Sequence, residues 1–222
     1  MKHLLNVLLI ALLSATPAVA GPISFNFTFS GAAYGGNSSV ATGIITFDGS
    51  LLANPGRNLW DPGNNYSDYG TATPGLVTAL SVTVTGSSAG NGTFTLADFN
   101  GVLFDTSSLA LNLTQPLVGQ PTSSPNSATW GTPDPVPSSN PAASYTGDFQ
   151  LFAISSSAAP TGISPFQLGT DYGNGDGLQL ASFTSSAAVP EPGSLALFGA
   201  GLAALVWARK GRSGKAFAAP RH

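Results

Sequence analysis

The sequence predicts an all-β fold: a single antiparallel β-sandwich or jelly-roll-like domain, flanked by an N-terminal signal peptide and a C-terminal membrane helix. Two observations predict the domain. Apolar and polar side chains alternate with a period of two along several segments, which is the pattern of a strand with one buried face. Residues 21–188 also contain no Glu and no Lys, and they are rich in β-branched residues. This composition favours strands over helices.

The N-terminal segment, residues 1–20, has the three parts of a secretory signal peptide. A basic start at Lys2 is followed by an apolar run over residues 4–13 and by the small-x-small triplet Ala18-Val19-Ala20. About ten apolar residues are too few to cross a hydrocarbon core, which takes roughly twenty. We therefore expect cleavage after Ala20 and export of the rest of the chain.

Residues 21–188 form the predicted exported domain. Alternation predicts a first strand over residues 23–30, where Phe25, Phe27 and Phe29 share one face. Further strands are predicted at residues 44–47, 80–85, 109–113, 149–153 and 178–184. Six to nine strands joined by Gly and Asn turns favour an antiparallel sandwich or a jelly roll.

Two long connections interrupt the strands. Residues 116–141 carry seven prolines among Ser, Thr and Asn, a composition that favours an extended surface loop. Residues 54–73 hold a cluster of aromatic, amide and carboxylate side chains: Trp60, Asp61, Asn65, Tyr66, Asp68 and Tyr69. Such a cluster suits a carbohydrate site, because rings stack on sugar C–H faces while carboxylates and amides bind hydroxyls. The alternative is a packed Ω-loop whose aromatic rings cover the edge of the sandwich.

A second candidate site lies at residues 171–177. Asp171, Asn174 and Asp176 are oxygen ligands spaced as in a calcium-binding turn, but Ser182 stands where an EF-hand would place Glu. A hairpin turn built on Asn-Gly and Asp-Gly explains the same residues. Calcium is therefore a candidate ligand, and no other cofactor is expected.

The residue inventory excludes most catalytic chemistry. The chain has no Cys, its two His are His3 and His222 outside the domain, and the domain has no Lys. It therefore lacks an imidazole base, a thiol nucleophile and an amine. The string Gly86-Ser87-Ser88-Ala89-Gly90 resembles a nucleophile elbow but has no base to serve it, so we expect a turn. Asp105-Thr106-Ser107 has no second copy to form an aspartic-protease pair.

The charge of the domain indicates which partners and which location it suits. It has nine Asp and one Arg, Arg57, so its net charge is about minus eight. This charge disfavours nucleic acid as a partner and suits an extracellular protein.

The C-terminal segment has a fixed order of features. Pro190, Glu191 and Pro192 precede an apolar run at about residues 194–208, and a basic tail begins at residue 209. Fifteen helical residues span roughly 22 Å, less than the roughly 30 Å of a hydrocarbon core, so the run is a marginal anchor. The residues expected at its membrane end are Trp207, Arg209, Lys210 and Arg212. Basic residues after an apolar run stay in the cytoplasm, which places the domain outside.

This order resembles a PEP-CTERM sorting domain over residues 189–212, the signal that exosortase systems recognise in Gram-negative bacteria that make exopolysaccharide. The resemblance implies that the precursor passes through the inner membrane, is held there transiently, and is processed near the motif by the exosortase, a membrane-embedded cysteine transpeptidase. The chain departs from the commonest pattern by continuing past Arg212 for residues 213–222. An ordinary single-pass tail with a chance Pro-Glu-Pro is the alternative.

These observations together predict a non-enzymatic exported protein at the cell surface or in the extracellular matrix. A structural or adhesive role in an exopolysaccharide or biofilm matrix is the leading interpretation. A carbohydrate-binding module is the second. A polysaccharide-acting enzyme is the third, because only Asp pairs could supply its two carboxylates.

Overall fold

The computed structural model describes residues 21–32, 34, 36–123, 127–133, 148–164 and 167–186. These residues belong to one compact unit, Gly21–Val189. The predicted signal peptide, the Pro-Glu-Pro motif and the predicted membrane helix lie outside the described residues. Within the described ranges, no helix is long and apolar enough to cross a membrane.

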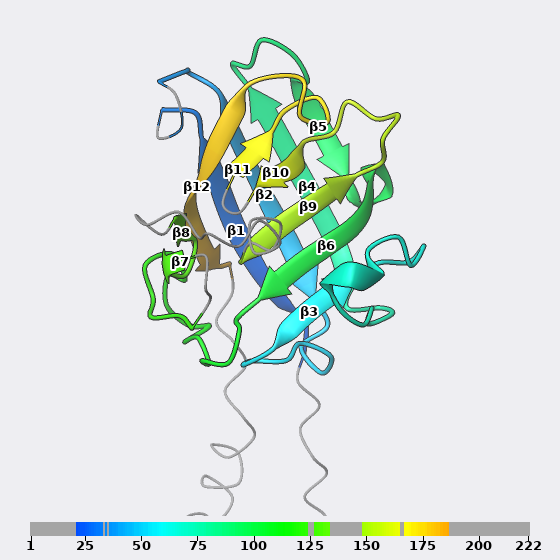
Figure 1. Cartoon of the computed structure of the whole chain (residues 1–222), viewed down its shortest axis with the longest axis vertical. Coiled ribbons are helices and arrows are strands. Elements are labelled where there is room, and N and C mark those ends of the chain that lie inside the picture. Colours follow the sequence, from blue (N-terminus) through cyan, green and yellow to red (C-terminus); the bar gives the residue numbers. More distant parts are fainter. Residues whose placement is uncertain are drawn as a thin grey trace, which may run out of the picture. The chain divides into compact units, whose positions relative to one another are not determined.

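The described unit is built almost entirely of antiparallel strands (Figure 1). A seven-stranded sheet has the order β10-β11-β12-β1-β2-β4-β5, a three-stranded sheet the order β3-β6-β9, and β7 pairs with β8. The strands are β1 (Ile23–Ser30), β2 (Val40–Phe47), β3 (Arg57–Trp60), β4 (Val77–Thr85), β5 (Gly92–Thr95), β6 (Phe99–Asp105), β7 (Ser127–Thr129), β8 (Thr132–Pro133), β9 (Phe149–Ala153), β10 (Thr161–Ser164), β11 (Gln167–Gly169) and β12 (Gly177–Ser185). Two short 3-10 helices are η1 (Ser67–Tyr69) and η2 (Leu96–Asp98). The all-β, antiparallel prediction is confirmed.

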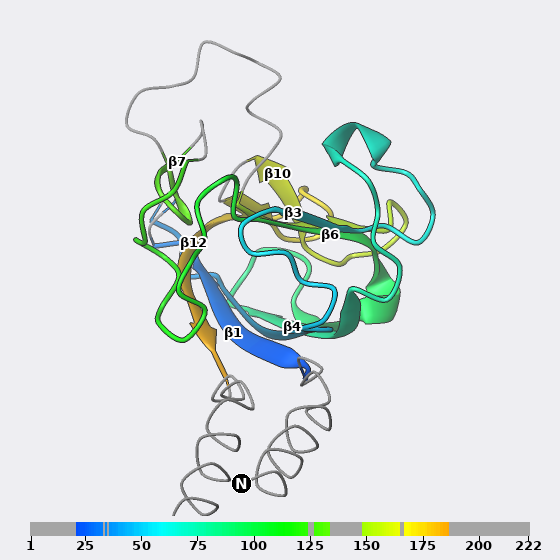
Figure 2. The same ribbon diagram turned by 90° about the horizontal axis from the view of Figure 1, so that it is seen from below.

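The two larger sheets share one hydrophobic core; Figure 2 shows β1 and β4 of the large sheet opposite β3 and β6 of the small sheet, with β10 of the large sheet on the same side as β3 and β6. The alternation in β1 places Phe25, Phe27 and Phe29 on the buried face, as the sequence predicts. The ring of Phe25 lies 6.0 Å from that of Phe104 on β6, and the ring of Phe27 lies 5.1 Å from that of Phe149 on β9. Aromatic packing between strands of both sheets therefore forms the centre of the core.

The prediction of a strand over residues 109–113 is wrong. This segment is irregular and lies between two turns, with Leu109 exposed and Leu111 buried. The Asn54 side chain explains the difference, because its amide donates to the carbonyl of Leu111 at 2.7 Å and its oxygen accepts the Leu111 N–H at 2.9 Å. A side-chain amide thus takes the place of a neighbouring strand.

The prediction of a surface loop over residues 116–141 is only partly right for its described part, where most residues are exposed or half-buried but two large side chains are not. Leu117 and Trp130 are fully buried in the main core, and the short hairpin β7–β8 flanks Trp130. The indole N–H of Trp130 donates to the carbonyl of Asp105 at 2.9 Å. The prolines exclude a long strand, but they do not stop two large apolar side chains from anchoring the segment. Residues 134–141 lie outside the described ranges.

Residues 54–73 also contain more regular structure than a loop. β3 lies inside this segment and pairs with β6, and η1 follows it. β3 has four residues, which is too short for a clear alternation in sequence. Its position fixes which face of the small sheet each side chain of the aromatic cluster can reach.

Candidate functional site

The outer face of the small sheet carries a second, smaller apolar cluster, which we call the tyrosine cluster. It consists of Leu59 on β3, Leu103 on β6 and Phe152 on β9, covered by Tyr66 and Tyr69. The ring of Tyr66 stacks on Phe152 at 4.2 Å, and the Tyr69 ring meets Phe152 edge-on at 5.3 Å. The segment around η1 therefore folds back over this face of the sheet.

Two hydrogen bonds fix the position of Tyr66, one at its hydroxyl and one at its backbone N–H. Its hydroxyl donates to Asn100 Oδ1 at 2.7 Å, and its backbone N–H donates to Asp61 Oδ2 at 2.7 Å. Burial of the ring raises the pKa of the Tyr66 hydroxyl above its ordinary value, so the group remains a neutral donor at physiological pH. The ring sits where Gly101 leaves room: a Cβ at that position would come within 2.8 Å of Tyr66 and 3.0 Å of Phe152.

Asp61, which lies next to the tyrosine cluster, is a buried acidic residue. Its exposed fraction is 6%, and its Oδ1 atom has no hydrogen-bond partner among the described residues. A buried carboxylate oxygen without a donor is costly, which makes it a natural acceptor for a hydroxyl or a water molecule that reaches it. Asp61 thus combines a fixed orientation, set by the Tyr66 N–H, with one vacant acceptor.

The predicted carbohydrate residues divide between three environments. Tyr66, Tyr69 and Asp61 come together as described, whereas Asn65 and Asp68 are exposed on the covering segment. Trp60 packs against the main core, on the opposite side of β3 from Leu59. The sequence alone missed this separation, because it follows from the alternation of β3, which was not predicted. It also missed Asn100 and Gly101, for which no sequence pattern exists.

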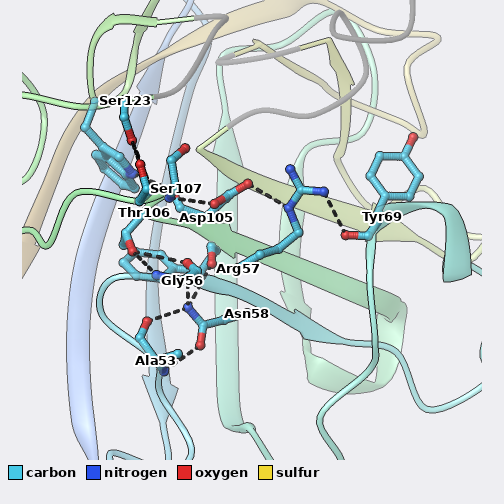
Figure 3. Close-up of polar contacts among 12 residues, drawn as sticks. Ala53, Gly56, Arg57, Asn58, Tyr69, Asp105, Thr106, Ser107 and Ser123 are labelled. Carbon is cyan, nitrogen blue, oxygen red and sulfur yellow. Dashed lines mark hydrogen bonds and ion pairs between the residues drawn. The ribbon is translucent and has the colours of Figure 1, made fainter.

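An ion pair lies beside the tyrosine cluster (Figure 3). Arg57 Nε donates to Asp105 Oδ2 at 2.8 Å, and Arg57 Nη1 donates to the carbonyl of Tyr69 at 3.2 Å. The other carboxylate oxygen of Asp105 accepts the Ser107 N–H at 2.7 Å. The single Arg of the domain therefore joins β3 to β6 and holds the end of η1, and both oxygens of Asp105 have structural partners.

The predicted calcium turn joins β11 to β12, so it is a hairpin connection. The carboxylate of Asp176 points to two serines: Oδ2 accepts Ser39 Oγ at 2.5 Å and the Ser88 N–H at 2.9 Å, and Oδ1 accepts Ser88 Oγ at 2.7 Å. These hydrogen bonds, from Ser39 and Ser88, lower the pKa of Asp176 to about 2. Asp171 is half-buried and Asn174 is exposed.

No group of three or more Asp, Glu, His or Cys that could hold a metal occurs among the described residues. Calcium binding at Asp171, Asn174 and Asp176 stays a prediction. The structure does show hydrogen bonds between the turn before β12 and the connection after β4. Ser88 Oγ donates to Asp176 Oδ1, and Ser87 Oγ lies 2.7 Å from Thr170 Oγ1. Ser88 stands in a turn, as expected for its glycine-flanked string.

The comparisons with known proteins give one match. Residues 188–210 match the family model of the PEP-CTERM protein-sorting motif. Comparison with curated proteins and with solved structures returned no match. The matched range contains Pro190, Glu191 and Pro192 together with Trp207, Arg209 and Lys210, while Arg212 follows it. The chain therefore carries the PEP-CTERM sorting motif of exosortase substrates, and it is an exported protein that an exosortase system sorts towards the cell surface or the exterior.

Proposed function

We propose that this protein is a non-catalytic structural or adhesive component of an exopolysaccharide or biofilm matrix. The PEP-CTERM motif at residues 188–210 is the observation that carries the proposal, since it directs the domain to the cell exterior. The residue inventory supports a role without catalysis, because the domain has no His, Lys, Cys or Glu. The signal peptide at residues 1–20 and transient residence in the inner membrane are part of the same proposal.

The proposed architecture is a β-sandwich with a jelly-roll-like arrangement. The common core of the seven-stranded and three-stranded sheets supports it. Such a domain is suited to a matrix role, because the outer face of the seven-stranded sheet carries exposed side chains that are available for contacts, while the core keeps the fold rigid without disulfides.

The experiment that tests export and sorting compares the mature protein in a host with and without its exosortase. Intact mass and cell fractionation are the readouts. We expect a product shortened near Pro190 and found outside the inner membrane only when the exosortase is present. The Glu191→Ala variant should remain full-length in the membrane, whereas Ser213→Ala, beyond the matched residues, should be processed normally. A full-length protein in the membrane under all conditions would refute the proposal.

A carbohydrate-binding role at the tyrosine cluster is the second candidate function. The observation that favours it is the vacant Oδ1 atom of Asp61 beside aromatic rings. Asp61→Asn and Tyr69→Ala should then weaken polysaccharide retention without unfolding the protein. Trp60→Ala is not a clean test, because Trp60 packs against the main core and its loss would lower stability. Unchanged retention in both Asp61→Asn and Tyr69→Ala would count against this site.

A further inference from the structure

The outer face of the seven-stranded sheet carries a row of hydroxyl side chains that only the strand register reveals. Thr28 on β1 pairs with Ser182 on β12 and with Thr42 on β2, Thr42 pairs with Thr83 on β4, and Thr83 pairs with Thr93 on β5. Five neighbouring strands therefore each place a Ser or Thr at the same level. We call this the hydroxyl row: Ser182, Thr28, Thr42, Thr83 and Thr93. Neighbouring strands lie about 4.8 Å apart, so the row is about 19 Å long.

A second row runs beside the first, two residues along each strand. It is formed by Thr184, Asn26, Ile44, Ser81 and Thr95. Ile44 is the one apolar member, and its exposed fraction is 41%. A shallow groove in the centre of the face is lined by Asn26, Thr28, Thr42, Ile44, Ser81 and Thr83. This face lies on the far side of the large sheet in Figure 1, away from β6 and β9.

The chemistry of these two rows is uniform. None of the ten side chains is ionisable, although the domain as a whole is acidic. Each hydroxyl offers one donor and two acceptor positions, and a β-branched Thr in a strand has little rotamer freedom left to lose. Thr83 Oγ1 lies 2.9 Å from Thr93 Oγ1, so neighbouring hydroxyls of the row are close enough to orient one another.

These properties select an uncharged, hydroxyl-rich and extended ligand. An anionic ligand would lose hydration on this face without gaining a cationic partner from the two rows, and the net negative charge of the domain repels polyanions. A sugar chain supplies both donors and acceptors, and its C–H faces suit the exposed Ile44 in the centre of the groove.

We propose that the hydroxyl row and the groove beside it bind an uncharged polysaccharide chain that runs across the strands of the large sheet. The proposal rests on the proposed matrix function and deepens it by assigning a surface and a ligand class. It is independent of the tyrosine cluster, which lies on the outer face of the other sheet.

The test uses the protein recovered from a host that carries its exosortase. Amorphous cellulose and dextran serve as uncharged polysaccharides, and alginate serves as a polyanion. The main variant combines Thr28→Val, Thr42→Val and Thr83→Val, which removes three hydroxyls and keeps the β-branched shape. The control is Thr71→Val, an exposed threonine outside the large sheet. We expect the wild type and the control to bind an uncharged polysaccharide, and the triple variant to bind it at least about tenfold more weakly, given typical hydrogen-bond contributions.

A second variant, Thr42→Lys, places a long charged side chain in the groove and keeps the proposal testable if the triple variant fails to fold. It should lose the same binding while its melting temperature stays close to that of the wild type. Unchanged binding in either folded variant would overturn the proposal, as would tighter binding to alginate than to cellulose or dextran. If a folded variant instead abolishes self-association seen by size-exclusion chromatography, the face binds a second copy and the proposal is wrong. A negative result in these binding assays leaves the proposed matrix function standing. That function is refuted by a different result, retention of the protein in the membrane in the fractionation experiment.

Discussion

Replacing Trp130 by Ala should remove the anchor that holds the proline-rich segment to the core. The side chain is fully buried, its ring centre lies 5.6 Å from that of Phe104 and 5.3 Å from that of Phe183, and its indole N–H donates to the Asp105 carbonyl. Truncation of a buried aromatic residue to Ala typically costs about 3–5 kcal/mol. Trp130→Phe keeps most of the packing but leaves the Asp105 carbonyl without its indole donor, and we expect it to cost about 1–3 kcal/mol.

Urea unfolding followed by far-UV circular dichroism measures both changes as differences in the free energy of unfolding. The control is Leu109→Ala, because Leu109 is 44% exposed and its truncation should change that free energy by no more than about 0.5 kcal/mol. The reasoning is refuted if Trp130→Ala costs less than about 1 kcal/mol, since the segment would then not be anchored by this residue. Equal losses for the Phe and Ala variants would show that the hydrogen bond dominates over the packing.

Three further changes test the polar and close-packed contacts. Gly101→Ala should lower the free energy of unfolding by about 1–3 kcal/mol, because the added Cβ meets the Tyr66 ring, and a thermal melt would show it. Asp176 has a folded pKa of about 2 against an ordinary value of 3.8, so its contribution is fully present above about pH 4 and is lost as the pH falls through 2. The melting temperatures of the wild type and Asp176→Asn should therefore differ at pH 5 and converge towards pH 2, and a constant difference would contradict this origin. Asp61→Asn should leave the free energy of unfolding unchanged or raise it, since the Oδ1 atom has no partner to lose; a loss above about 1 kcal/mol in urea would contradict that geometry.

Four of the strands that the sequence predicts have one buried and one solvated face, whereas β9, which the sequence also predicts, is buried along its whole length. These four are β1, β2, β4 and β12, whose buried and less buried positions alternate in the described structure, so the period of two also shows in the sequence. β6 was not predicted, because it is buried on both faces: the main core lies on one side and Leu103 of the tyrosine cluster on the other. A strand that is covered on both faces need not show an alternation of apolar and polar residues.

The candidate sites, like the strands, could be predicted from the sequence only in part. The sequence places Tyr66 and Tyr69 near one another because they are close in the chain, and the structure packs both against Phe152. It could not place Trp60 on the other side of β3, and it could not reveal the hydroxyl row, because both depend on pairing and register. Register is set by the turns and the buried faces of strands that are distant in sequence.

The position of β12 determines how the domain carries mechanical load. β12 is the last strand among the described residues, and it is an interior strand of the seven-stranded sheet, paired with β1 on one side and β11 on the other. Near its end, the Phe183 carbonyl also accepts the Leu117 N–H at 2.8 Å. β11 pairs only with residues 177–179 of β12, so a pull on the chain beyond Ser185 is resisted first by the pairing of β12 with β1 and by this hydrogen bond from Leu117. A tether attached at this point pulls on an interior strand, whereas one attached to the edge strand β5 would peel the sheet from its side.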